Sequence, residues 1–181
     1  MRVIKLANNN ISYARSISFN NYPYFDTLDL SSNKFSSIVN FNGLSSPIVA
    51  NLSKNNFSSV VFGPSSTSNF RTLKLDVSRN QMNKNQIQGL DNLKDLTHFD
   101  ISYNLFADTI PPIGLEFANL EYFNASHNLF SGGIANLSSL FNIKTIDLGN
   151  NRFVGNQFGD LTGLKKLEFF AIDSNALART E

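Results

Sequence analysis

Residues 96–106, LTHFDISYNLF, decide the fold. In this stretch Asn104 has apolar residues eight, five and three positions before it (Leu96, Phe99 and Ile101) and Phe106 two positions after it. The same frame returns every 22 to 25 residues, and its asparagines are Asn9, Asn33, Asn55, Asn80, Asn104, Asn128, Asn151 and Asn175. A constant frame at a nearly constant period predicts a stacked repeat protein.

The apolar residues of the frame predict a short strand in each repeat. Residues two apart in a strand share one face, so Phe99 and Ile101 are expected to point to the same side. A strand this short cannot bury its apolar side alone, but eight strands stacked in parallel, about 4.8 Å apart, bury one continuous core. With the first apolar residue of the frame as position one, the asparagine is the ninth position of each repeat.

The frame, L-x-x-L-x-L-x-x-N-x-F, resembles the leucine-rich repeat family over essentially the whole chain. The residues after several asparagines resemble the plant-type subfamily, N-x-L/F-x-G-x-I-P-x-x-L-x-x-L, found in receptor-like protein and receptor kinase ectodomains. The segments that match best are residues 104–111, 128–140 and 151–164. In the first half of the chain, residues 36–38 and 58–60 lack the glycine and proline.

The resemblance implies an α/β repeat solenoid, a curved array with a parallel β-sheet on its concave face and loops or 3₁₀ turns on its convex face. It also implies a second short strand at each I-P segment, such as Ile110-Pro111, and a 3₁₀ or loose helical turn at each x-x-L-x-x-L segment. We expect residues 1–181 to form a single array of about eight repeats, without recognisable N- or C-terminal caps. Because repeat arrays need polar capping units, we expect missing caps or a neighbouring subunit to cover the terminal repeats.

Two columns of repeated residues are expected to be scaffold. An asparagine amide both donates and accepts hydrogen bonds, so the ninth-position column can satisfy backbone groups of neighbouring repeats. The phenylalanines two residues later predict a stacked internal spine, made of Phe35, Phe57, Phe106, Phe130 and Phe153.

Composition excludes several classes of partner. The net charge is +1, 16% of the residues are charged and no basic stripe is present, so nucleic-acid binding is not predicted. No apolar run approaches the roughly 20 residues of a membrane span, so this segment is not expected to insert into a membrane. The chain has no cysteine, which excludes disulfides and thiolate zinc sites.

Function is expected on the strand side chains that point away from the core, at the third, fifth, seventh and eighth positions. The fifth and seventh columns mostly hold Asp or Asn and Ser, the family's usual wording, which indicates scaffold positions. The third and eighth columns vary, and in the middle repeats they offer aromatic and cationic side chains that suit recognition. We predict a protein or peptide contact patch over repeats three to six, with ordinary surface variation as the alternative. Its residues are Lys54, Lys74, Asp76, Arg79, His98, Asp100, Tyr103, Tyr122, Asn124 and His127.

An enzyme is not predicted. His98, Asp100 and Ser102 match a serine hydrolase by residue type, but in that mechanism the histidine must lie between the serine and the carboxylate. Same-face residues of a strand are also about 6.7 Å apart. The aspartate column has no D-x-D-x-D-G spacing, so no metal site is predicted, and no cofactor is expected. We expect the carboxylates to be balanced locally by nearby cations: Lys54, Lys74, Arg79 and Lys144.

Five N-x-S/T sequons provide candidate acceptors for N-glycosylation: Asn10, Asn51, Asn56, Asn124 and Asn136. Sugars at Asn51 and Asn124 would obstruct part of the concave face. The resemblance favours an extracellular or cell-surface location over a cytoplasmic one.

Two functions remain open. The first is a non-catalytic recognition module that resembles the ligand-binding ectodomains of plant receptors and binds a protein or peptide through its concave or lateral face. The second is a structural or assembly subunit that docks within a larger complex. The plant-type repeat wording favours the first, and the missing caps favour the second.

Overall fold

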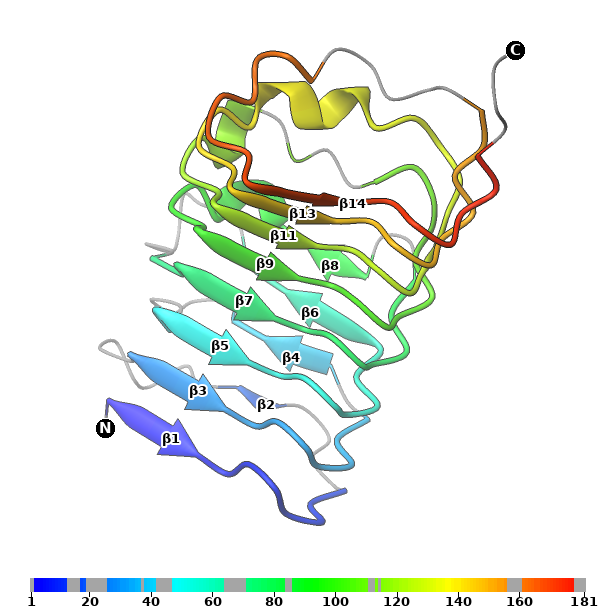
Figure 1. The fold of residues 1–181 in the computed structure, drawn as a ribbon. Coiled ribbons are helices and arrows are strands. Elements are labelled where there is room, and N and C mark those ends of the chain that lie inside the picture. Colours follow the sequence, from blue (N-terminus) through cyan, green and yellow to red (C-terminus); the bar gives the residue numbers. More distant parts are fainter. Residues whose placement is uncertain are drawn as a thin grey trace.

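A computed structural model shows one continuous solenoid (Figure 1). It describes residues 2–12, 17–18, 26–36, 38–41, 47–63, 71–83, 86–110, 113, 115–155 and 161–177, with side chains except at Ile17, Ser18, Leu115 and Asn136. The chain coils from β1 at one end of the stack to β14 at the other (Figure 1). In the described residues no helix is long and apolar enough to cross a membrane.

One face of the solenoid is an eight-stranded parallel sheet, in the order β1-β3-β5-β7-β9-β11-β13-β14. Its strands are Val3–Lys5, Thr27–Asp29, Val49–Asn51, Lys74–Asp76, His98–Asp100, Tyr122–Asn124, Thr145–Asp147 and Phe169–Ala171. Each strand covers the third to fifth positions of its repeat, and equivalent positions pair, as Leu75 does with Phe99. The predicted parallel solenoid, its period and its register are therefore confirmed.

A second side carries shorter strands. A four-stranded sheet contains β2 (Ile17–Ser18), β4 (Ile38–Asn40), β6 (Ser59–Val61) and β8 (Ile87–Gln88), and a two-stranded sheet contains β10 (Ala107–Asp108) and β12 (Leu129–Phe130). The larger sheet lies in the half of the chain that lacks the glycine and proline of the plant-type wording. Val39 of β4 and Phe41 just after this strand are fully buried, so an apolar face and parallel partners suffice to form the sheet.

The prediction of a second strand at Ile110-Pro111 is wrong for Ile110. This residue follows β10 and is buried outside any strand, and Pro111 lies outside the described residues. Proline cannot donate a ladder hydrogen bond, which is consistent with a strand that ends before the I-P segment.

Short 3₁₀ helices occupy the third side: η1 (Leu90–Asn92), η2 (Leu115–Phe117) and η3 (Ala135–Ser139). They fall at x-x-L-x-x-L segments, as predicted. Leu90 of η1 is buried on the core side, and Leu93 and Leu96, which follow η1, are fully buried as well. The described residues contain no α-helix, and the predicted repeat solenoid, with a parallel sheet on one face and 3₁₀ turns on another, is confirmed.

The asparagine ladder is confirmed as scaffold. The Nδ2 group of Asn104 donates to the carbonyl oxygens of Val77 (3.0 Å) in the preceding repeat and Ile101 (3.1 Å) in its own, and its Oδ1 accepts from the backbone N–H of Met82 (3.0 Å). Asn33, Asn55, Asn80, Asn128, Asn151 and Asn175 repeat this pattern. The ladder therefore ties every repeat to the one before it.

The phenylalanine spine is also confirmed. Phe35 stacks on Phe57 with ring centroids 5.7 Å apart, Phe106 on Phe130 at 6.0 Å, and Phe130 on Phe153 at 6.5 Å. Met82 takes the equivalent slot in the fourth repeat and is fully buried.

The terminal repeats are less covered than the inner ones. Leu6 is 41% exposed, whereas Leu30 and Ile101 at the same position are at most 1% exposed. In the last repeat Phe170, Ile172 and Leu177 are only partly buried.

Candidate functional site

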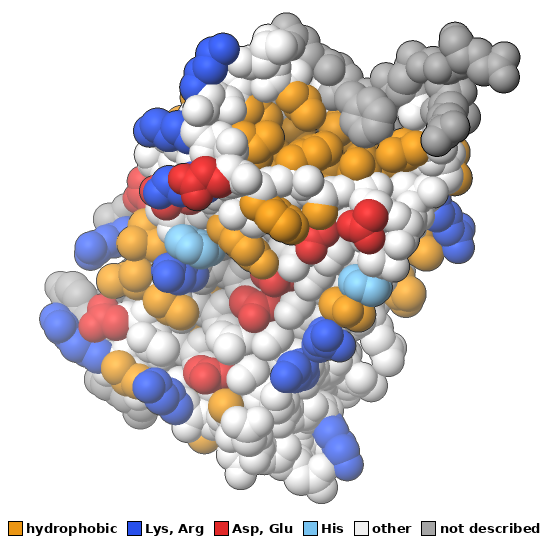
Figure 2. All heavy atoms as spheres, in the orientation of Figure 1, with side chains coloured by type: hydrophobic (Ala, Val, Ile, Leu, Met, Phe, Trp, Pro, Cys, Tyr) orange, Lys and Arg blue, Asp and Glu red, His pale blue; other side chains and the backbone are white. Residues whose placement is uncertain are grey.

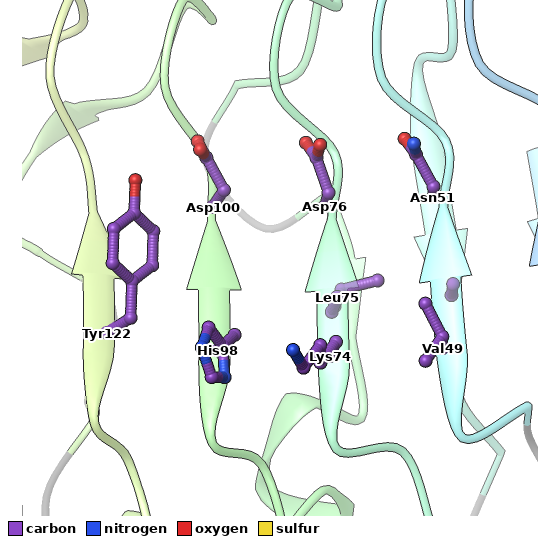
Figure 3. Close-up of a pocket in the computed structure, with 9 residues that line it drawn as sticks. Val49, Asn51, Lys74, Leu75, Asp76, His98, Asp100 and Tyr122 are labelled. Atoms are coloured by element: carbon purple, nitrogen blue, oxygen red, sulfur yellow. The ribbon is translucent and has the colours of Figure 1, made fainter.

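The outer face of the eight-stranded sheet has a hollow of about 240 Å³ over β5, β7, β9 and β11. Figure 3 shows how its side chains divide. Asn51, Asp76 and Asp100 form one row, and Val49, Lys74 and His98 lie at the other end of the same strands, with the Tyr122 ring beside them (Figure 3). Ala50 and Leu75 complete the lining. The hollow therefore joins an oxygen row to a mixed aromatic and cationic row.

The oxygen row also holds the turn that follows each strand. Oδ1 of Asp76 accepts the backbone N–H of Ser78, and Oδ1 of Asp100 accepts that of Ser102, both at 2.9 Å. Asp29, Asn51, Asn124 and Asp147 accept in the same way from the seventh position. This bond accounts for the recurring Asp-or-Asn and Ser columns.

The carboxylates of the hollow are not neutralised by direct ion pairs among the described residues. The predicted balance is wrong for Lys144, which pairs with Glu121 at 2.8 Å, while Arg79 stacks on an aromatic ring. Burial raises the pKa of Asp100; hydrogen bonds from Ser102 oppose this rise, and the charges of Asp76 and Asp147 add to it. Asp76 and Asp100 thus form no direct ion pair among the described residues, although Lys74 lines the same hollow.

The aromatic row is ordered by stacking. His98 and Tyr122 lie with ring centroids 5.9 Å apart and planes 22° from parallel, and His98 Nδ1 is 2.9 Å from Thr97 Oγ1. Burial, and next the charge of Lys74, lower the pKa of His98, which favours the uncharged form of this ring. Burial raises the pKa of Tyr122, whose hydroxyl accepts from Asn124 Nδ2 at 3.3 Å. Asn124 also reaches Asp100 Oδ2 at 3.5 Å.

A second group of predicted residues lies on the turn after the strands. We call the eighth-position side chains Lys54, Arg79, Tyr103 and His127 the rim. The Arg79 guanidinium carbon lies 3.8 Å from the Tyr103 ring centroid, and the Tyr103 and His127 centroids are 3.9 Å apart with planes 13° from parallel. None of the four lines the hollow. The structure therefore divides the ten predicted contact residues. Five line the hollow (Lys74, Asp76, His98, Asp100 and Tyr122), Asn124 hydrogen bonds to two of these, and four form the rim.

Sequence reasoning missed the backbone conformation of the rim. The eighth position is left-handed in all eight repeats, with φ between 53° and 56°. A signal was present in the sequence: the column reads Asn8, Ser32, Lys54, Arg79, Tyr103, His127, Asn150 and Ser174. It contains no Val, Ile or Thr, which are genuine outliers at positive φ. A second hollow, of about 300 Å³ beside the strand starts, was also missed; it is lined by Leu73, Asp95, Thr97, Asn119, Glu121 and Asn142.

The His98, Asp100 and Ser102 set is not arranged as a nucleophile, histidine and carboxylate. Ser102 hydrogen bonds to Asp100, and the Nδ1 of His98 is next to Thr97. Within the described residues, no three His, Asp or Glu side chains are grouped as metal ligands.

The sequons fall in two environments. Asn51 and Asn124 lie in strands on the sheet face, and the Oδ1 of each accepts from the serine of its own sequon at 2.7 Å. Asn10 and Asn56 are exposed, and Asn136 lies in η3 with its side chain outside the described residues.

Comparisons with known proteins place the repeats in context. No family model matches the chain. The receptor-like protein CLAVATA2 of Arabidopsis thaliana is 28% identical over 90 residues, 50% of this chain, and the receptor-like protein EIX1 of Solanum lycopersicum is 34% identical over 85 residues, 46% of it. An adenylate cyclase of Schizosaccharomyces pombe is 36% identical over 85 residues, 47% of the chain. The matches cover 12%, 8% and 5% of these proteins, so the chain spans a small part of each.

Solved structures resemble the whole solenoid. A leucine-rich repeat protein of Leptospira interrogans superposes with a TM-score of 0.69 at 20% identity, covering 98% of this chain and 44% of that one. The Arabidopsis receptor kinase HAESA, solved with the peptide hormone IDA and the co-receptor SERK1, gives 0.59 at 18% identity, covering 97% of this chain and 38% of that one. At these identities the likeness concerns the fold.

Proposed function

Because the chain is a leucine-rich repeat protein whose relatives include plant receptor-like proteins, we propose that it is a non-catalytic recognition module for a peptide or protein. The observation that carries the proposal is the hollow, where Asp76 and Asp100, which form no direct ion pair among the described residues, lie beside Lys74 and the stacked His98 and Tyr122. Lys74, His98 and Tyr122 are three consecutive third-position residues that are cationic or aromatic, whereas Val49 before them and Thr145 after them are neither.

The size of the hollow favours a side chain over a small-molecule cofactor. Drug-sized ligands occupy pockets of roughly 300–1,000 Å³ that bury most of their surface. The hollow measures about 240 Å³ and is open along the sheet, so it accommodates one or two side chains of an extended segment. A tyrosine wall supplies rigid contact area, and Asp76 and Asp100 can accept hydrogen bonds from a basic or amide group.

The similar proteins support a peptide-binding role by analogy. HAESA, one of the chains that resembles this solenoid, is described in complex with a peptide hormone. The chain covers 38% of HAESA, so the analogy extends to a recognition surface and not to a particular hormone.

Display of random peptides against the immobilised chain, followed by calorimetry on the selected peptides, tests this proposal. We expect Tyr122→Ala and Asp76→Asn each to weaken binding about tenfold or more while the melting temperature stays unchanged. Thr145→Ala is the matched control, since Thr145 holds the third position of the next repeat outside the hollow. Selected peptides that bind both hollow variants like the wild type would overturn the assignment.

A second candidate is a structural or assembly role, which the exposure of the terminal repeats favours. Leu6 and Ile172 hold equivalent core-facing positions of the first and last repeats, and Leu6 is 41% exposed while Ile172 is only partly buried. We propose that further repeats, caps or a neighbouring subunit cover these repeats in the working protein. Sedimentation of the chain tests the subunit version: self-association that Leu6→Ser or Ile172→Ser abolishes supports it, and a monomer at all concentrations contradicts it.

We further propose an extracellular or cell-surface location with N-glycans at Asn10 and Asn56. Both side chains are exposed and lie off the sheet face. Mass spectrometry of chain secreted from a plant host tests this: glycans at these two asparagines support the proposal, and unmodified sequons contradict it.

A further inference from the structure

The rim has the features of a second docking surface, separate from the hollow. Arg79, Tyr103 and His127 come from three consecutive repeats and form a single stack with spacings of 3.8 and 3.9 Å. Their backbone is held in one left-handed conformation, so the stack is ordered before any partner arrives. Pre-ordered rigid side chains lose little conformational entropy on binding, which is a property of effective contact surfaces.

The rim also leaves apolar surface uncovered. Tyr103 is 39% exposed, and Leu105, two residues further along the same turn, is 50% exposed. Single exposed leucines are ordinary, but here the apolar surface adjoins a stacked ring and a guanidinium. Such a combination matches the aromatic and arginine residues that dominate binding energy at protein interfaces.

The charge of this turn indicates the sign of the charge expected on its partner. The eighth and tenth positions of the eight repeats hold sixteen residues, and none of them is Asp or Glu. They include the cations Lys34, Lys54, Arg79 and Arg152. Figure 2 shows Lys and Arg side chains and a histidine along the right-hand edge, the edge toward which the strands of Figure 1 run. An acidic partner is therefore complementary to this edge, whereas the oxygen row of the hollow has the opposite preference.

The stacking geometry distinguishes a peptide from an anionic saccharide. Sugars bind aromatic side chains through a free ring face, but Tyr103 lies between Arg79 in the repeat before it and His127 in the repeat after it, so both its faces are covered. What remains accessible is the ring edge, the Leu105 side chain and the free guanidinium donors. These groups suit an apolar side chain next to a carboxylate.

We propose that the rim and Leu105 form a docking surface for a protein segment that carries a carboxylate beside a large apolar side chain. The carboxylate would pair with Arg79, and the apolar side chain would cover Leu105 and the edge of Tyr103. This surface functions independently of the ligand in the hollow.

An NMR titration of the ¹⁵N-labelled chain tests the proposal with three probes: the peptide Ac-DFGDFGDFG-NH₂, its counterpart Ac-KFGKFGKFG-NH₂ and a heparin hexasaccharide. The acidic peptide should shift the amide signals of Arg79, Tyr103, Leu105 and His127. Binding should weaken about tenfold in Arg79→Glu and in Leu105→Ser. Lys94→Glu is the charge-matched control, because Lys94 is exposed next to η1 and far from the rim in the repeat.

Each other outcome overturns the proposal. A basic peptide that shifts the rim signals equally would remove the charge argument, and a saccharide that displaces the acidic peptide would identify a different class of partner. Acidic-peptide shifts confined to other residues would show that the rim is not the docking surface. The amide signals of His98 and Tyr122 are read in the same spectra, so a failure of the proposed binding in the hollow is distinguished from a failure of the proposed docking at the rim.

Discussion

Removing one asparagine from the centre of the ladder should destabilise the whole array. Asn104→Ala deletes the two bonds that cross to the preceding repeat, from its Nδ2 to the Val77 carbonyl and from the Met82 N–H to its Oδ1. Asn104 is 6% exposed and Met82 is fully buried, so water does not replace them readily. A buried polar group left without a partner costs about 1–3 kcal/mol, so the loss is about 2–6 kcal/mol.

A loss of this size is a large part of the roughly 5–15 kcal/mol that stabilises a typical domain. The assay is urea unfolding followed by far-ultraviolet circular dichroism. Because repeat arrays are stabilised by contacts between neighbours, weakening one central contact should also broaden the transition and lower its slope.

Asn9→Ala is the matched control. Asn9 is exposed, and its Nδ2 donates to the carbonyl oxygens of Leu6 and Ala7 within its own repeat. We expect a loss below about 1 kcal/mol, because exposed groups regain hydrogen bonds to water. If the two variants differ by less than about 1 kcal/mol, the ladder does not hold neighbouring repeats together and this reasoning is refuted.

Three further outcomes follow from the backbone and the hollow. Gly89→Ala should lower the melting temperature far more than Gly155→Ala: both have positive φ, but an added Cβ would lie 1.9 Å from the Phe62 carbonyl oxygen in the first case and meet nothing within 4 Å in the second. Equal losses would contradict this. Tyr103→Val should cost about 1–2 kcal/mol more than Tyr103→Asn in chemical denaturation, because asparagine tolerates the left-handed backbone and valine does not. Burial raises the pKa of Asp100 in the folded state above its value in the unfolded state. Protonated Asp100 therefore contributes fully to the free energy of unfolding at pH values below the unfolded pKa, and this contribution is lost as the pH rises through the folded pKa. Asp100→Asn should therefore raise the melting temperature at pH 7 but not at pH 3, and no difference between the two pH values would contradict the burial argument.

The sequence predicted the main sheet well because its signal repeats. Each inner strand must place the same apolar positions in the core, so the register read from Asn104 holds for Leu75, Phe99 and Phe123 alike. The second sheet was harder to predict. Its strands are two or three residues long and depend on partners in adjacent repeats, so no motif within one repeat marks their position.

The candidate site was predicted as a set of residues but not as an arrangement. The third and eighth columns were correctly placed outside the core. The separation of hollow from rim depends on the left-handed turn after each strand, and the stacking of Arg79 on Tyr103 depends on rotamers that no spacing rule specifies.

The asparagine ladder also determines how the molecule should respond to force. Among the described residues, every strand pairing joins neighbouring repeats, and each ladder bond lies within a repeat or crosses to the one before it, so a pull applied to the two chain ends meets none that spans the whole array. The repeats should therefore peel away one at a time, starting from the less covered ends. Each step would release about 24 residues, or roughly 80 Å of extended chain. The solenoid would then act as a graded extensible tether, and the number of steps under tension would count the repeats that have unfolded.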